Sequence, residues 1–184
     1  AIEGADYEAT YPGEGGVNRN SLTVDSNGNI YVTGEFETSL DFNPDPTDFD
    51  PSEETAYLST NGTGDPFVLK LNSNGDFIWV KHLAATIYPY GGQATDIETD
   101  NNGNIIVAGN FWGTIDFNSS EEIDTLNSHD YASIFVLKLD TSGNFLWVKH
   151  IGNSDQEMQS YNASKSMVLD NEGNIYTTGI FDGV

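Results

Sequence analysis

One five-residue phrase recurs five times along the chain, and it constrains the fold more than any other feature. It begins with Asp or Asn, has Gly at its fourth position and ends with Asn or Asp; the copies start at Asp25, Asn72, Asp100, Asp140 and Asp170. Stretches that alternate apolar and polar residues flank the copies, as in β-strands. The first side chain can accept backbone hydrogen bonds, and the Gly can adopt a positive φ. The phrase therefore predicts hairpin turns, and five residues are too few for an EF-hand calcium loop.

The phrase is part of a longer repeat. The copies at Asp25, Asp100 and Asp170 are 75 and 70 residues apart. Within each interval the motifs keep one order: Gly-x-Phe at 34–36, 109–111 and 179–181, Phe-Val-Leu-Lys-Leu at 67–71 and 135–139, and Trp-Val-Lys-His at 79–82 and 147–150. This order predicts four antiparallel strands per unit, which is typical of a β-propeller blade. Variable surface loops are expected at 41–66 and 116–132.

Two sets of repeated residues have more than one interpretation. Gly34, Gly109 and Gly179 fit an inner strand, where neighbouring blades crowd together, or else they mark β-bulges. Trp79 and Trp147 are expected to pack between adjacent blades, with ligand stacking as the alternative.

Two stretches resemble the SBBP-type β-propeller repeat, which is named for a seven-bladed propeller. They read "IYVTGEF…LDF…GTGDPFVLKLNSNGDFIWVKHL" and "IIVAGNFWGTIDF…ASIFVLKLDTSGNFLWVKHI". The resemblance extends over roughly residues 20 to 184. It implies an all-β propeller that is part of a large secreted or cell-surface bacterial protein.

The register of the repeat predicts a division into blades. Residues 1–19 are expected to end a preceding blade and its linker, 20–83 and 84–151 to form two blades, and 152–184 to form the first half of a third. Closed propellers have about four to eight blades. We therefore expect a fragment of a larger ring, completed by the rest of its own chain, with exposed blade faces. Ring closure by several copies is the alternative.

The charge of the chain excludes some partners. There are 29 acidic and 6 basic residues, giving a net charge of −23, which argues against nucleic acid and anionic membranes. No apolar run reaches the roughly 20 residues of a membrane helix, so no membrane insertion is expected. Lys70 and Lys138 are repeat-equivalent, as are Lys81 and Lys149, and we expect them to pair with neighbouring carboxylates.

Motifs for catalysis are missing from the sequence. It has no Cys, no His-Glu-x-x-His zinc motif and no Gly-x-Ser-x-Gly nucleophile motif. The histidines are His82, His129 and His150, and the first and last occupy the same repeat position, which indicates a scaffold role. We therefore expect no enzyme activity in this segment.

One acidic loop, "DFNPDPTDFDPSEE", is a candidate metal site. Calcium prefers several oxygen ligands from carboxylates, amides and carbonyls. The candidate ligands are Asp41, Asn43, Asp45, Asp48 and Asp50. Calcium is the one cofactor that the sequence suggests, and a solvated acidic loop is the alternative.

The predicted function is a non-catalytic scaffold or binding module for a protein or glycan partner, outside the cell or on its surface. By analogy with other propellers, the contact surfaces are the variable loops and the blade-linking loops 84–93 and 152–164. One alternative is a structural spacer or filament subunit. Another is the non-catalytic part of an enzyme whose active site lies outside this segment.

Overall fold

The computed structural model describes residues 17–37, 39–41, 57–60, 64–86, 91–118, 124–128, 132–152 and 161–181. All regular secondary structure in these ranges is β-strand. Within them, no helix is long and apolar enough to cross a membrane.

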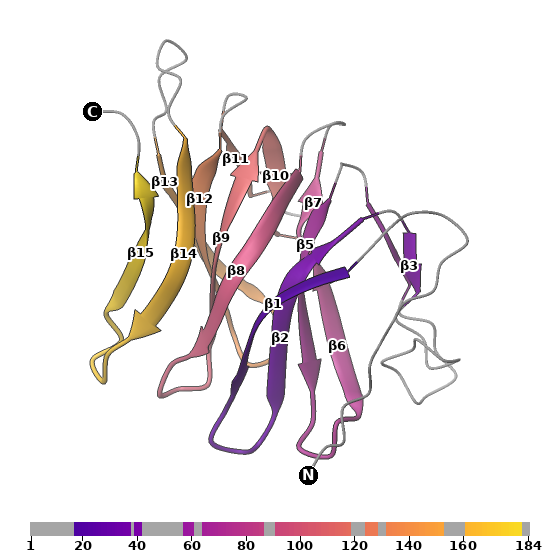
Figure 1. Cartoon of the computed structure of the whole chain (residues 1–184). Coiled ribbons are helices and arrows are strands. Elements are labelled where there is room, and N and C mark those ends of the chain that lie inside the picture. Colours follow the sequence, from indigo (N-terminus) through magenta and orange to yellow (C-terminus); the bar gives the residue numbers. More distant parts are fainter. Residues whose placement is uncertain are drawn as a thin grey trace.

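Two four-stranded antiparallel sheets and a two-stranded sheet correspond to the repeats (Figure 1). The first sheet has the order β1 (Val17–Val24), β2 (Ile30–Phe36), β5 (Asp65–Leu71) and β6 (Phe77–His82). The second has the order β8 (Gly91–Thr99), β9 (Ile105–Trp112), β12 (Ser133–Leu139) and β13 (Phe145–Ile151). The third pairs β14 (Asn162–Leu169) with β15 (Ile175–Phe181). The predicted four-stranded antiparallel repeat is confirmed.

The five copies of the phrase form the predicted turns, and these lie together at the lower end of the molecule in Figure 1. In the first copy, Gly28 has a φ of 83° and its backbone N–H donates to the carbonyl of Asp25. The four other copies have the same turn hydrogen bond and a positive φ at their Gly. The phrase is therefore a structural device that closes hairpins.

Short extra strands occupy or adjoin the expected variable loops, and one lies in the predicted blade-linking loop 84–93. β3 (Ser39–Asp41) pairs with β4 (Tyr57–Ser59). β10 (Thr114–Asp116) pairs with β11 (Thr125–Asn127) and also with β7 (Ala84–Ala85). Sequence patterning missed these strands because two or three residues are too few to establish an alternation.

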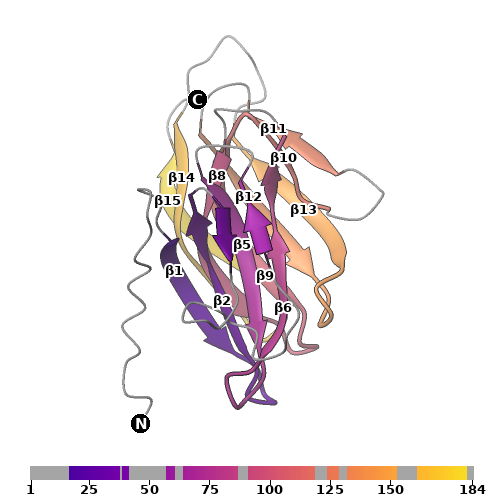
Figure 2. The same cartoon turned by 90° about the vertical axis from the view of Figure 1, so that its right-hand side faces the viewer.

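The sheets lie one behind another, as Figure 2 shows. Apolar cores fill the space between them. The larger core joins Tyr31 and Val68 of the first sheet to Phe111, Phe135 and Leu137 of the second. A smaller one joins the other face of the second sheet to β14. Both faces of the second sheet are therefore covered, and β9 and β12 are buried along almost their whole length.

The two predicted interface tryptophans lie between sheets. Trp79 packs against the core between the first and second sheets, and Trp147 packs against the core between the second and third. The packing prediction for both residues is confirmed.

Three glycines recur at the same position of the repeat, and crowding on an inner strand does not explain them. Gly34, Gly109 and Gly179 lie on β2, β9 and β15. The atoms nearest to a Cβ at Gly109 or Gly179 belong to the same sheet, so crowding by a neighbouring sheet is not the cause there. Each of the three glycines pairs with the residue at which the adjoining strand bulges. The crowding prediction is wrong at these two positions and the bulge alternative is confirmed, with the bulge on the partner strand.

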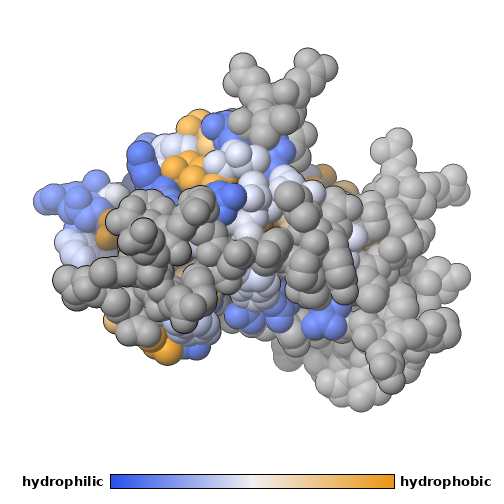
Figure 3. All heavy atoms as spheres, turned by 90° about the horizontal axis from the view of Figure 1, so that it is seen from above, coloured by the Kyte–Doolittle hydropathy of each residue, from blue (hydrophilic) through white to orange (hydrophobic). Residues whose placement is uncertain are grey.

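The outer sheets expose apolar side chains at places where the second sheet buries its residues. Leu22 on β1, Ile180 and Phe181 are exposed, whereas the equivalent residues of the second sheet are buried: Ile97, Asn110 and Phe111. Seen from above, orange apolar patches remain visible between hydrophilic residues (Figure 3). The expected exposure of sheet faces at the two ends of the stack is confirmed.

Candidate functional site: a polar groove between two turns

The β1–β2 turn and the β8–β9 turn flank a groove of about 510 Å³. The turn residues 25–27 and 99–103 form its walls, and Tyr31, Lys70 and Thr141 also line it. Because the flanking turns are copies of one phrase on adjacent sheets, the repeat itself creates the groove. Its lining is mainly polar.

The Asp25 carboxylate accepts four hydrogen bonds from its own turn and the following strand. It accepts the backbone N–H groups of Asn27 and Asn29, each at 2.9 Å, and the Asn29 side-chain amide at 2.8 Å. The Tyr31 hydroxyl donates to it at 3.1 Å. Burial raises the pKa of Asp25, but these hydrogen bonds together outweigh burial and lower it. The carboxylate is thus ionised at neutral pH, and its roughly four acceptor sites are occupied.

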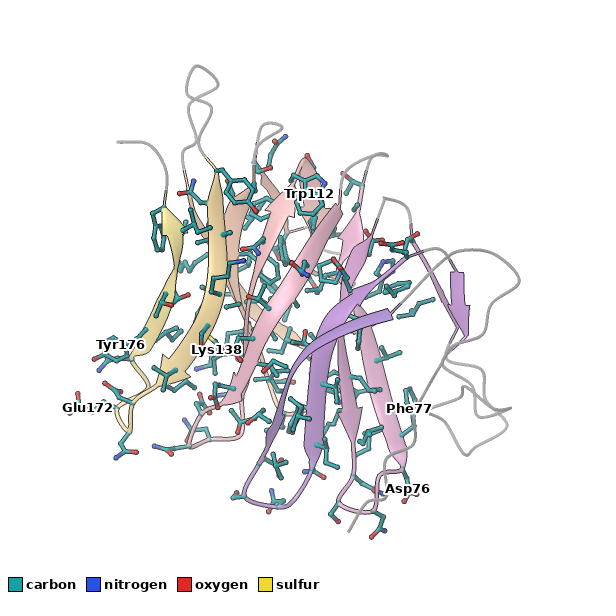
Figure 4. The ribbon with its side chains drawn as sticks, in the orientation of Figure 1. Asp76, Phe77, Trp112, Lys138, Glu172 and Tyr176 are labelled. Atoms are coloured by element: carbon teal, nitrogen blue, oxygen red, sulfur yellow. The ribbon has the colours of Figure 1, made fainter. Side chains whose placement is uncertain are left out.

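The Asp100 carboxylate has the same turn contacts and a different fourth donor. Asn102 and Asn104 supply three hydrogen bonds, and the Lys138 ammonium lies 2.8 Å away (Figure 4 labels Lys138). Burial raises the pKa of Asp100, but the hydrogen bonds from Lys138, Asn104 and Asn102 outweigh burial and lower it. The predicted pairing of Lys138 with a carboxylate is confirmed.

Lys70, the equivalent of Lys138, has different partners. Its ammonium donates to the Thr141 carbonyl at 2.8 Å and lies 5.2 Å from the centre of the Tyr31 ring, a cation–π distance. The predicted carboxylate partner is wrong here because the Tyr31 hydroxyl already occupies the fourth site on Asp25. In the second sheet the position of Tyr31 is held by Ile106, which has no hydroxyl.

The groove offers neutral hydrogen-bonding groups to a ligand. The side-chain amides of Asn27 and Asn102 have no hydrogen-bond partner among the described residues, and Ser26 adds a hydroxyl. The two carboxylates at its walls disfavour phosphates and other anions. This set of groups suits an uncharged polar ligand, such as a saccharide or a peptide backbone.

Most of the candidate calcium ligands fall outside the described residues. Asp41 ends β3, where its backbone alone is described, and Asn43, Asp45, Asp48 and Asp50 are not described. The calcium site therefore remains a prediction. Within the described ranges, no group of three or more His, Asp or Glu side chains is placed to hold a metal ion.

The second sheet shows what the corresponding acidic motif does there. The Asp116 carboxylate accepts the backbone N–H groups of Asn118 at 3.0 Å and Asp124 at 3.3 Å. The Asn118 side chain in turn donates to the Asp124 carboxylate at 3.1 Å. In this repeat, the motif stabilises the connection between β10 and β11.

The repeat-equivalent histidines pack in the same way. His82 contacts the buried Asp65 carboxylate at 2.7 Å and lies edge-on to Phe36, with ring centres 5.2 Å apart. His150 is edge-on to Phe111 at 5.4 Å. The shared ring packing fits the scaffold interpretation, while His129 lies outside the described residues.

Replacing Asp100 by Ala is expected to lower the free energy of unfolding by about 2 kcal/mol, because three turn hydrogen bonds and the contact with Lys138 are lost. Asp170→Ala is the matched control, since Asp170 caps an equivalent but exposed turn in which the neutral Tyr176 hydroxyl takes the place of the lysine. Urea denaturation measures both. A loss for Asp170→Ala as large as that for Asp100→Ala contradicts the assigned role of Lys138.

Tyr31 is expected to ionise at higher pH than Tyr176. Burial, followed by the hydrogen bond and charge of Asp25, raises the pKa of Tyr31 to about 12. Tyr176 makes the equivalent 3.1 Å bond to Asp170 but is exposed, and its pKa is also raised. A folded pKa above the unfolded value of 10.0 gives Tyr31 a stabilising contribution below pH 10 that is lost as pH rises through about 12. NMR titration of the two rings tests the order, and ionisation of Tyr31 first contradicts it.

Comparison with known proteins agrees with the repeat geometry. Residues 14–35, which include β1 and the first turn phrase, match the sequence model of the SBBP β-propeller repeat. The chain is also 25% identical over 181 residues to an uncharacterized WD repeat-containing protein of Acanthamoeba polyphaga mimivirus. That match includes 88% of this chain and spans 12% of the length of the relative. The chain therefore carries an SBBP-type β-propeller repeat, and its four-stranded antiparallel sheets are consistent with propeller blades.

Proposed function

We propose that the chain is a non-catalytic part of a larger β-propeller, with about two and a half blades present, in a secreted or cell-surface protein. The supporting observation is the contrast between two equivalent residues. Ile97, on the sheet with neighbours on both faces, is 1% exposed, whereas Leu22 at the same position of the first sheet is 65% exposed. Additional blades would cover such a surface.

In this proposal the groove between the β1–β2 and β8–β9 turns binds a protein or glycan partner. The side-chain amides of Asn27 and Asn102, which have no partner in the described part of the chain, supply hydrogen bonds, and the hydrogen-bonded turns hold them in place. The proposed absence of catalysis is supported by the ring packing of His82 and His150 and by the saturated turn carboxylates.

The ring proposal is tested by the intact mass of the polypeptide isolated from its source. A mass far above 20.1 kDa is expected, because a ring needs further blades. A mass near 20.1 kDa contradicts the ring and favours a second function, an assembly subunit whose exposed sheet faces are covered by other copies. Light scattering of the purified chain then distinguishes that assembly from a monomer.

The groove proposal is tested by NMR titration with a panel of neutral oligosaccharides and unmodified peptides. Shifts of the side-chain amides of Asn27 and Asn102 are expected, and Asn27→Ala should weaken binding about tenfold. Asn74→Ala is the matched control, since Asn74 occupies the same position of a different turn. Binding that is equally sensitive to both substitutions contradicts the groove.

A further inference from the structure

Two neighbouring pairs of hairpin turns are built alike but joined differently. The β1–β2, β8–β9 and β14–β15 turns follow one another along the lower end of the molecule (Figure 1). The second position of the turn phrase is Ser26 in the first of them, Asn101 in the next and Asn171 in the last. The Asn101 side-chain amide donates to the Asn171 carbonyl at 3.0 Å and so bridges the second pair of turns. The Ser26 side chain is one atom shorter and forms no such bond with a described residue, and the groove lies between the first pair.

The strands that lead into these turns are similarly close in both pairs. Asp96 follows the bulge of β8, and Ser21 and Ser166 hold the equivalent places on β1 and β14. The Asp96 carboxylate accepts the Ser21 hydroxyl at 2.7 Å and the Ser166 hydroxyl at 3.2 Å. One side chain therefore reaches both neighbouring strands. We expect the first pair of turns to leave a space of the size that the Asn101 carboxamide fills in the second.

The groove contains the acceptor that such a bridge would use. The Asn171 backbone carbonyl accepts from Asn101, and Asn101 itself holds the same position one turn earlier and lines the groove. Because the turns are copies of one structure, the Asn101 carbonyl is directed toward the β1–β2 turn. No described residue donates to this carbonyl or accepts from the Ser26 hydroxyl. A ligand can therefore supply the donor that Ser26 does not.

The charges of the groove favour a neutral carboxamide over a carboxylate. Asp25 and Asp100 each contribute a negative charge to its walls, against the single positive charge of Lys70. The Lys70 ammonium already donates to the Thr141 carbonyl at 2.8 Å, and Lys70 is only 8% exposed. A ligand carboxylate would be repelled by the two aspartates and has no N–H for the Asn101 carbonyl. A ligand ammonium would find both aspartates already supplied with donors.

We propose that the groove binds the side-chain carboxamide of an asparagine or glutamine in a partner protein. The carboxamide nitrogen donates to the Asn101 carbonyl, and the carboxamide oxygen accepts from the Ser26 hydroxyl. The ligand thus takes the place that the Asn101 side chain holds between the next two turns. This inference rests on the proposed function of the groove and goes further by naming the kind of partner and the group that is recognised.

The test uses the whole chain and capped peptides of the sequence Gly-Ser-X-Ser-Gly, in which X is Asn, Gln, Asp or Glu. The backbone N–H of Asn102 belongs to the same peptide group as the Asn101 carbonyl, so its NMR signal should shift when the Asn and Gln peptides are added. The Asp and Glu peptides should bind about tenfold more weakly, because their side chains cannot donate to a carbonyl. This preference should persist in about 1 M salt, where charge repulsion is screened.

A matched pair of protein variants locates the site. Ser26→Asn introduces the side chain that bridges the next pair of turns, so it should fill the groove and weaken peptide binding about tenfold. Ser142→Asn makes the same change in the β12–β13 turn, at a position outside the lining of the groove, and should retain binding. Both variants should fold, because other copies of the turn phrase have Asn at the same positions.

The inference is overturned if neither carboxamide peptide binds, if the acidic peptides bind equally well, or if the two variants lose binding equally. Selective binding of an N-acetylglucosamine trimer instead, with a loss in Asn27→Ala, would refute the carboxamide ligand and leave the proposed function of the groove intact. Carboxamide-selective binding that Ser26→Asn weakens and Asn27→Ala does not would support the inference and refute the role proposed for Asn27.

Discussion

Replacing Gly109 by Ala is expected to lower the free energy of unfolding by about 3 kcal/mol. The added Cβ would meet the Gln93 carbonyl oxygen of β8 and the Phe135 ring of β12. These lie on the two strands that flank β9, so movement away from one contact is restricted by the other strand. Close packing of the buried sheet leaves little room for relaxation. Chemical denaturation should show a lower midpoint with an unchanged slope.

Gly75→Ala is the control that separates steric overlap from backbone strain. Gly75 has a φ of 91°, yet a Cβ there would meet nothing within 4 Å. Its substitution should cost only about 1–2 kcal/mol, the price of a left-handed conformation for alanine. A loss at Gly109 no larger than that at Gly75 would show that the second sheet can relax around the methyl group.

The sequence predicted the sheets well because their signals are local and repeated. Every copy of the turn phrase combines a capping side chain with a glycine at positive φ, and both are visible in the sequence. The alternation of β2, β5, β9 and β12 then fixes the strands between the turns. The repeated glycines were visible in the sequence too, but the reason for them was not. That reason is a bulge in the partner strand, which is distant in the sequence: Gly109, for example, pairs with Ala94, where β8 bulges.

The groove was less predictable because it depends on contacts between repeats. Lys70 and Lys138 lie in the same motif, Phe-Val-Leu-Lys-Leu, yet of the two only Lys138 contacts a carboxylate. The difference originates at Tyr31, whose hydroxyl takes the acceptor site that the second sheet leaves to lysine. The available signal was the presence of Tyr31 where the next repeat has Ile106. This difference could be interpreted only once the structure showed that the aspartate of each turn lies beside both the Tyr31 position and the lysine position.

Replacing Asp96 by Ala is expected to lower the free energy of unfolding by about 3 kcal/mol and to loosen the stacking of all three sheets. Asp96 lies on β8 directly after its bulge. One carboxylate oxygen accepts the Ser21 hydroxyl of β1 at 2.7 Å, and the other accepts the Met167 backbone N–H of β14 at 2.7 Å. The Ser166 hydroxyl adds a third contact at 3.2 Å. Without Asp96, the N–H of the buried Met167 loses this acceptor.

Two variants and one titration identify the source of this effect. Ser21→Ala removes only the contact with β1, so it should cost about 1 kcal/mol. Asp96→Asn should fall between the two, because one amide oxygen replaces the two carboxylate oxygens that accept from Ser21 and Met167. Burial, and then the charge of Asp96, raises the pKa of Glu98. In folded Asp96→Asn that pKa should fall toward its ordinary value. A Glu98 titration that does not move would show that the charge of Asp96 does not act on Glu98. A fall in pKa with equal losses for Ser21→Ala and Asp96→Ala would instead assign the stabilisation to the β1 contact alone.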